Sequence, residues 1–309
     1  MIGRGALACN VARALAAHSS ERLVVVISTT GGDDAIDPTS PVCSRELADR
    51  LLAIRPATLV LLAFSESPVT PPLPWLADAA LADAVTGALD RLVQLGGRAP
   101  ALLLLTSTAV YGVASGSPLV FDERSPLPRE SSFASAAARW AQGLRDVEKQ
   151  LVVWAVHNGS EVGVLRTASV MGAPGSAGFP AGPPAATTID SPWAALLRAR
   201  LPLRVLGYDP PCQVIHYDDL VAAVALAIEQ GCGEVLNLVG RSVVPLSRLL
   251  AMAGVVAPAL PGPLADRIAP AAVDGQRLRW RTLADGRRAT ALLGFRPQKS
   301  LEDCLRAPR

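Results

Sequence analysis

The sequence predicts an α/β protein built on a Rossmann-like, doubly wound parallel sheet. Short continuous runs of β-branched and leucine residues alternate with longer segments whose apolar residues recur at helical spacing. Runs of this kind are typical of parallel strands covered on both faces, and their alternation with helices favours right-handed crossovers. The expected strands are Leu23–Ile27, Leu59–Phe64, Ala101–Leu105, Val162–Leu165 and Val235–Val239, and the expected helices are Leu7–His18, Arg45–Ile54, Trp75–Leu95, Ser132–His157 and Asp218–Gln230.

Two segments interrupt this alternation and predict a smaller C-terminal substrate lobe. Residues 172–192 are rich in Gly, Pro and Ala, and the chain from Val255 onward is rich in Pro and Arg. We expect residues 1–171 to form the dinucleotide-binding core and residues 172–309 to form mainly the lobe, with residues 212–240 returning to the core sheet. Ligands of open α/β sheets bind at the carboxyl ends of the strands, so such a lobe would close over a pocket.

The composition excludes several classes of protein. Hydrophobic residues make up 50% of the 309 positions and charged residues 18%, which is unlike a disordered chain. The net charge is only +2 and no basic block stands out, so we expect neither a nucleic-acid nor a membrane partner. The five scattered cysteines form no C-x-x-C pair, and no apolar run approaches the ~20 residues of a membrane helix. We therefore expect a cytoplasmic protein without a metal site.

A glycine turn at the start of the chain is a candidate cofactor site. Residues 3–8 fit the pattern G-x-G-x-x-G/A and lead into a helical pattern, so backbone amides there can approach a pyrophosphate. The candidate cofactor-binding residues are Gly3, Gly5 and Ala8. Only two residues precede the turn, and we therefore expect the first core strand to be truncated. A glycine-rich turn that binds no ligand accounts for the pattern equally well.

The strand after this turn lacks the usual acidic residue. A nicotinamide-dinucleotide site commonly places Asp or Glu at this point, against the adenosine ribose. Here Leu23–Ile27 continues into Ser28-Thr29-Thr30-Gly31-Gly32, whose hydroxyls can bond a ribose or a phosphate. Asp37 is a candidate contact on the adenine side, although a turn residue before proline is an equal explanation.

Five short motifs occur along the chain in one order. They are Thr106-Ser107-Thr108-Ala109-Val110-Tyr111-Gly112; Phe121-Asp122-Glu123 with Leu127-Pro128; Leu165-Arg166 with Val170-Met171-Gly172; Val214-Ile215-His216-Tyr217-Asp218-Asp219-Leu220; and Leu293-Gly294-Phe295-Arg296-Pro297. Together they resemble the motifs of extended short-chain dehydrogenases/reductases, the NAD-dependent epimerase/dehydratase family that acts largely on nucleotide sugars. The resemblance covers nearly the whole chain. It implies a Rossmann fold, NAD or NADP as cofactor, and a nucleotide or nucleotide sugar as ligand.

The resemblance also identifies the residues expected to carry chemistry. Family members use a Tyr, a Lys four residues later on the same helix, and a Ser or Thr that polarises the substrate oxygen. Ser107 matches the Ser, whereas Phe133 occupies the Tyr position and Ala137 the Lys position. The sequence contains no Tyr-x-x-x-Lys at all. We therefore expect a degenerate member, a pseudoenzyme that binds or regulates without ordinary hydride transfer.

The remaining site residues follow from the same resemblance. Ala63, in the expected strand Leu59–Phe64, is a candidate cofactor contact, and Ser107, Glu123 and Arg166 are candidate substrate contacts. An alternative is an active enzyme in which Ser107, Glu123 or His216 transfers the proton. A Ser107 hydroxyl bonded to its own loop accounts for that residue without a ligand.

The two long helices resemble those through which family members pair. These are the expected helices Trp75–Leu95 and Ser132–His157, and the second is rich in alanines that permit close packing. We therefore expect either a homodimer formed through the core helices or a subunit of a larger complex.

Overall fold

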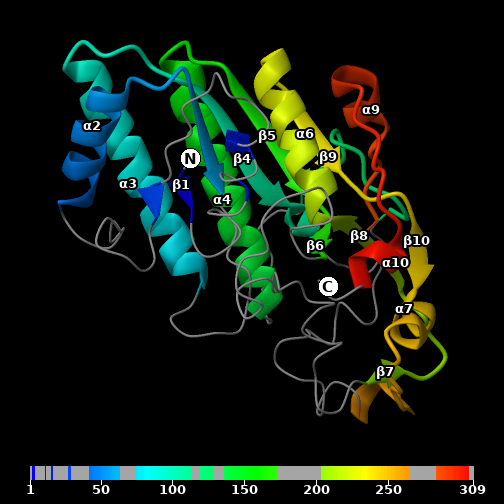
Figure 1. Ribbon diagram of the computed structural model, residues 1–309. Helices are drawn as coiled ribbons and strands as arrows, with labels where there is room; N and C mark the ends of the chain where they lie inside the picture. The colour runs from blue at the N-terminus through cyan, green and yellow to red at the C-terminus, as the bar shows by residue number, and fades with distance from the viewer. Residues whose placement is uncertain are drawn as a thin grey trace.

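The computed structural model describes residues 2–3, 11, 15–16, 27–28, 42–62, 74–112, 118–127, 136–172, 203–264 and 283–305. In this part of the chain, six parallel strands form the main sheet in the order β2-β1-β3-β4-β5-β9 (Figure 1). The α/β, doubly wound architecture predicted from the sequence is confirmed. The six strands are β1 (Ile2–Gly3), β2 (Ile27–Ser28), β3 (Thr58–Leu62), β4 (Ala101–Ser107), β5 (Val162–Thr167) and β9 (Val235–Leu238).

The leucine-rich strands are buried on both faces, as continuous apolar runs require. Alternate residues of β3 and β4 enter two separate hydrophobic clusters. Leu59, Leu61, Leu102 and Leu104 pack with the helices α2 (Cys43–Ile54), α3 (Pro74–Gln94) and α4 (Ala136–His157). The residues between them pack with α6 (Tyr217–Gln230) on the opposite face. The sheet therefore lies between two helical layers, and its ends are the places left for polar groups.

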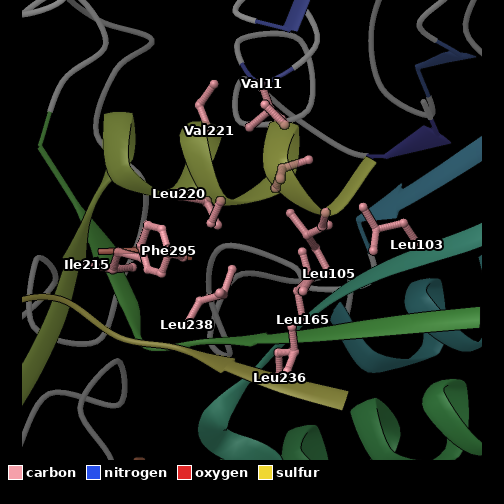
Figure 2. Packing of buried hydrophobic residues seen from close by; sticks show 14 of the residues in the cluster. Val11, Leu103, Leu105, Leu165, Ile215, Leu220, Val221, Leu236, Leu238 and Phe295 are labelled. Atoms are coloured by element: carbon pink, nitrogen blue, oxygen red, sulfur yellow. The ribbon is translucent and has the colours of Figure 1, made fainter. Parts of the chain in front are cut away.

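Figure 2 shows the second of these clusters from close by. Leu220 points from α6 toward strands that carry Leu105, Leu165 and Leu238, with Phe295 beside it. Val11 belongs to the same cluster and is fully buried. Burying a leucine of this kind stabilises the fold by about 1.5–3 kcal/mol. This cluster fixes α6 and the segment after α9 (Arg287–Leu293) against the core sheet.

The second half of the chain adds two small sheets beside the first. In one, β8 (Pro211–His216) pairs in parallel with β6 (Ser169–Met171) and antiparallel with β10 (Val243–Pro245). In the other, β7 (Arg204–Val205) pairs in parallel with β11 (Ala259–Leu260). The short helices α7 (Leu246–Met252) and α10 (Leu301–Leu305) pack against β8 through a third apolar cluster.

Several element boundaries differ from the sequence prediction. β4 and β5 each run two residues further, to Ser107 and Thr167, because Thr106 and Arg166 pair in the ladder although they are polar. Within residues 212–240, β8 joins a separate sheet and β9 joins the main sheet. Of the expected strand Leu23–Ile27 and helix Leu7–His18, the structure describes only Ile27 and residues 11, 15 and 16.

The expected first strand has a partner on each side. Ile2 lies opposite Ile27 in β2 and opposite Leu61 in β3, so β1 occupies an inner position of the sheet with two residues. No helix in the described ranges is long and apolar enough to cross a membrane.

Candidate functional site

The strand order indicates a candidate ligand site at the carboxyl ends of β1 and β3. The chain passes from β1 to β2 on one side and then returns to β3 on the other side of β1. Ligands of open α/β sheets bind outside the carboxyl ends at such a reversal of strand order. Gly3 is the last residue of β1 and lies opposite Ser28, the last residue of β2. Four predicted cofactor residues lie outside the described residues: Gly5, Ala8, Asp37 and Ala63.

Ser107 lies one strand further along the same edge. It ends β4 and begins the 3-10 turn η1 (Thr108–Tyr111), where its Oγ accepts a hydrogen bond of 3.2 Å from the backbone N of Ala109. The local bond that the sequence left open is therefore present. A hydroxyl that accepts one bond keeps its own proton for another partner. No described residue accepts that proton, and because Ser107 is half-buried, the described part of the chain leaves it to a ligand at the strand ends.

A buried ion pair lies directly behind Ser107. Arg166 Nη2 is 2.7 Å from Glu148 Oε2, and Arg166 Nε donates to both carboxylate oxygens at 3.2–3.3 Å. Thr106 Oγ1 donates to Glu148 Oε1 at 2.5 Å. Burial lowers the pKa of the Arg166 guanidinium, but hydrogen bonds and the charge of Glu148 outweigh it, and the net pKa shift is upward. The predicted substrate contact Arg166 thus has its charge paired inside the protein.

Tyr111 connects this ion pair to the last strand of the sheet. Its hydroxyl accepts from Arg166 Nη1 at 3.2 Å and donates to Asn237 Oδ1 at 2.8 Å. Its ring stacks on Phe121, with ring centroids 4.9 Å apart. Burial raises the pKa of the phenol, partly opposed by Arg166. Tyr111 is therefore a neutral, fully bonded group of the interior.

Glu123 and His216, the other two candidates for proton transfer, also have internal partners. Glu123 Oε1 accepts from the backbone N of Asn237 at 2.8 Å, which covers the outer edge of β9. His216 Nδ1 accepts from the backbone N of Asp218 at 3.1 Å and caps α6. Burial lowers the pKa of His216, which favours the neutral imidazole that this acceptor role requires. Both contacts serve the scaffold, and a ligand role for Glu123 stays a prediction.

The structure describes every tyrosine and lysine of the sequence. Tyr111 and Tyr217 are buried and Tyr208 is half-buried, between β7 and β8. Lys149 is exposed on α4, and Lys299 Nζ is 3.4 Å from Asp218 Oδ2. None of these tyrosines precedes a lysine by four residues on a helix.

The face of α4 that meets the Ser107 turn is occupied by other residues. Leu144 is buried against Val110 and Tyr111, and Arg145 Nη1 donates to the carbonyl oxygen of Val110 at 2.8 Å. Ala137 lies in the first turn of α4, and Phe133 lies outside the described residues. In the part of α4 whose side chains are described, no lysine is directed at this turn.

Sequence analysis did not single out Thr106, Glu148 or Asn237. Asn237 carried a usable signal, because it is the one polar residue in the apolar run VLNLV and buried polar groups require partners. Glu148 carried none, since an acidic residue in a long helix is usually solvated. Among the described residues, no group of His, Cys, Asp and Glu is arranged to hold a metal ion.

Solved structures of nucleotide-sugar epimerases share this architecture. UDP-glucuronic acid 4-epimerase from Bacillus cereus, in complex with NAD, aligns over 99% of this chain and 96% of its own, with a TM-score of 0.66 and 16% identity. UDP-glucose 4-epimerase from Bifidobacterium longum, with NAD+ and UDP, aligns over the same shares with a TM-score of 0.68 and 14% identity. The chain has the fold of these epimerases. The fold predicted from its motifs is thereby confirmed.

A third solved structure with this fold carries a tyrosine-to-phenylalanine substitution. It is a tyrosine-to-phenylalanine mutant of the Bacillus cereus epimerase, in complex with NAD and UDP-4-deoxy-4-fluoro-glucuronic acid. It aligns over 99% of this chain and 96% of its own, with a TM-score of 0.63 and 17% identity. No family model and no curated protein matches the sequence.

Proposed function

We propose that the chain is a degenerate member of the epimerase/dehydratase family that binds a dinucleotide and a nucleotide sugar without ordinary hydride-transfer catalysis. The observation that carries the proposal is where the three tyrosines and two lysines lie. All five are described, and no Tyr-x-x-x-Lys pair exists in the sequence. The fold that positions ligands is thus combined with the loss of the groups that move protons.

The strand ends support the binding half of the proposal. Gly3 ends β1 where the strand order reverses, which fits close approach of a pyrophosphate to the backbone. Ser107 keeps a proton to donate at the same edge. Two of the similar structures contain NAD together with UDP or a UDP-sugar analogue, and one of these two is the tyrosine-to-phenylalanine mutant. In that enzyme the ligands are therefore bound although a tyrosine hydroxyl has been removed.

The same residues do not fit the chemistry of a nicotinamide cofactor. When bound, such a cofactor accepts and returns a hydride, while the protein must exchange a proton with the substrate oxygen. In this chain Ser107 can orient that oxygen, but the phenyl ring of Phe133 has no proton to exchange. The methyl group of Ala137 can neither bond a ribose nor lower a pKa. Removal of a positioned acid or base typically reduces the rate by about 10²–10⁴-fold.

Binding and turnover should be measured separately. We expect NAD+, NADH, NADP+ or NADPH, and UDP-glucose or UDP-glucuronic acid, to raise the thermal unfolding midpoint. A ligand at 100 times its Kd adds about 2.7 kcal/mol, equivalent to several degrees. We expect no epimerisation, dehydration or reduction of these sugars in long incubations with cofactor. Ordinary turnover would overturn the claim of lost catalysis, and no shift with any nucleotide would overturn the claim of binding.

The alternative of an active enzyme now depends on Ser107. Glu123 and His216 have internal hydrogen-bond partners, whereas Ser107 retains a proton that no described partner accepts. If turnover is found, Ser107→Ala should abolish it, and unchanged turnover would remove Ser107 from the mechanism. Thr86→Ala, on α3 away from the strand ends, is a matched loss of one hydroxyl.

The oligomeric state is a separate proposal. α3 and α4, the pair of core helices expected to form a homodimer, are joined by Gln150 Nε2 to Asp83 Oδ1 at 2.8 Å and by Trp154 Nε1 to Asp90 Oδ1 at 2.6 Å. These bonds hold the two helices side by side. Light scattering of the purified protein distinguishes a homodimer from a monomer, and co-purification of another chain would indicate a larger complex.

A further inference from the structure

We propose that Asn237 is a positioning residue that couples the Ser107 turn to residues 283–285, so that ligand binding at the turn and docking of this segment depend on each other. The coupling rests on the proposed binding function for its role, but its geometry stands independently. It is carried by an unbroken series of hydrogen bonds that begins at the buried ion pair and ends at the segment.

The segment 283–285 is held beside residue 121, outside the three sheets. Phe121 N donates to Leu283 O at 2.7 Å, and Asp285 N donates to Phe121 O at 2.8 Å. This single bridge contains too few backbone bonds to hold the two stretches by itself. Two side-chain amides complete it, one from β8 and one from β9.

Gln213, on β8, forms the first of these attachments. Its Nε2 donates to Ala284 O and its Oε1 accepts from Ala284 N, both at 2.9 Å, which imitates the pairing of a neighbouring strand. Gln213 and Ala284 are both buried. Among the described residues, Gln213 forms no hydrogen bond to the Ser107 turn, which makes it a matched control for the second attachment.

Asn237, on β9, forms the second attachment and is fully buried. Its Nδ2 donates to Asp285 O at 3.3 Å and to Phe121 O at 3.5 Å. Its Oδ1 accepts from Tyr111 at 2.8 Å. An amide is the group that provides two donors and an acceptor in this space. Asn237 is therefore bonded at once to the turn that starts at Ser107 and to both stretches of the bridge.

The donor and acceptor roles in this series have only one consistent direction. Arg166 has no acceptor atom, so the Tyr111 hydroxyl must accept from Arg166 and direct its proton to Asn237 Oδ1. The nitrogen of Asn237 then faces the carbonyl oxygens of Phe121 and Asp285. A reversed amide would place its oxygen against two carbonyl oxygens, which costs two hydrogen bonds. A displacement of Tyr111, the last residue of η1, therefore changes the attachment of the segment.

Hydrogen exchange of single amides tests the coupling without ligand. The reporters are the amides of Phe121 and Asp285, with β4 amides as the measure of global stability. Loss of one buried hydrogen bond corresponds to about a fivefold to tenfold rate change. We expect Tyr111→Phe to accelerate both reporters by about this factor beyond any change in β4. Asn237→Asp keeps the acceptor, removes both donors and sets an oxygen against two carbonyl oxygens, so it should accelerate both reporters by more than Tyr111→Phe does.

The combination of variants separates coupling from ordinary destabilisation. Tyr111→Phe should add nothing at Phe121 and Asp285 when Asn237→Asp is already present. Gln213→Glu is the matched amide-to-acid change and should accelerate hydrogen exchange of the Ala284 amide. When it is combined with Tyr111→Phe, the changes in exchange rate that the two variants cause separately should multiply. The coupling is overturned if Tyr111→Phe leaves the reporters unchanged relative to β4, or if its effect multiplies with that of Asn237→Asp. Should Asn237→Asp not fold, Tyr111→Phe alone decides.

A titration with UDP-glucose connects the coupling to binding. In the wild-type protein we expect UDP-glucose to slow hydrogen exchange of the Phe121 and Asp285 amides. In Asn237→Asp we expect this protection to be lost, while the Ala284 amide keeps its protection from exchange. Protection that is equal in both proteins overturns the coupling. If calorimetry finds no binding of UDP-glucose or of the other nucleotides to wild-type protein, the proposed function fails. In that case the ligand-free exchange still decides the coupling.

Discussion

Replacing Arg166 by methionine should cost the protein about 3–5 kcal/mol of its free energy of unfolding. The change leaves the Glu148 carboxylate in the interior with only Thr106 as its described side-chain donor. Both side chains of the pair are 7% exposed, so water cannot replace the lost guanidinium. Removing one member of a buried pair is costly because the remaining charge is uncompensated. The loss is large against a typical total of about 5–15 kcal/mol.

Urea unfolding followed by circular dichroism measures this loss directly. With an m-value of about 3 kcal/mol/M, the midpoint should fall by about 1–1.7 M. Glu148→Gln together with Arg166→Met should cost at least about 2 kcal/mol less than the sum of the two single variants, because the neutral amide no longer needs a cation. A cost below about 1 kcal/mol for Arg166→Met, or additive single effects, would refute the reasoning.

An exposed ion pair provides the control for the same substitution. Arg50 Nη2 lies 2.9 Å from Glu46 Oε1 on α2, with both side chains substantially exposed. Arg50→Met should cost no more than about 0.5 kcal/mol, since exposed pairs one helical turn apart contribute little.

Three further predictions concern the backbone and pH. Gly163→Ala should destabilise by about 2–3 kcal/mol in urea, because a Cβ there would overlap the carbonyl oxygen of Cys232; a neutral result would contradict the close approach. Arg55→Gly should stabilise by about 0.5–1 kcal/mol, since Arg55 ends α2 at φ 49°, whereas Arg55→Ala should give no gain. Burial lowers the pKa of His216, so below pH 6.5 the unfolded chain binds a proton that the folded one does not. The free energy of unfolding should therefore decrease as the pH falls below 6.5. His216→Asn should make this dependence on pH less steep.

The fold could be predicted because its strands are coded locally. Continuous leucine and valine runs such as Leu102–Leu105 are typical of strands covered by helices on both faces, and the structure buries each of these residues. The ends of strands were harder to predict. Arg166 and Thr167 extend β5 because their side chains find partners on α4 and β4, and that pairing exists only after the sheet has formed.

The candidate site could be predicted only where a residue's hydrogen-bond partner is close to it in the sequence. Ser107 was expected two residues beyond the strand Ala101–Leu105, and the structure makes it the last residue of β4, where its hydroxyl caps the adjacent turn. The role of Arg166 was not predictable in the same way. Its motif indicated a ligand contact, but the partner that holds its charge lies 18 residues away on a helix. Tyr111 and Asn237 are 126 residues apart, and only the folded sheet brings them together.

The hydrogen bond between the Glu123 carboxylate and β9 also bears on strand pairing between copies of this chain. β9 is an outermost strand of the main sheet, and such strands offer unpaired amides on which another chain can add itself. Here Glu123 accepts one of those amides, and the stretch that ends at Gly286 lies alongside. Among the described residues, Glu123 and residues 283–286 are thus the groups that cover this edge. Release of residues 283–286 would expose this part of β9 to pairing with the strand of another chain.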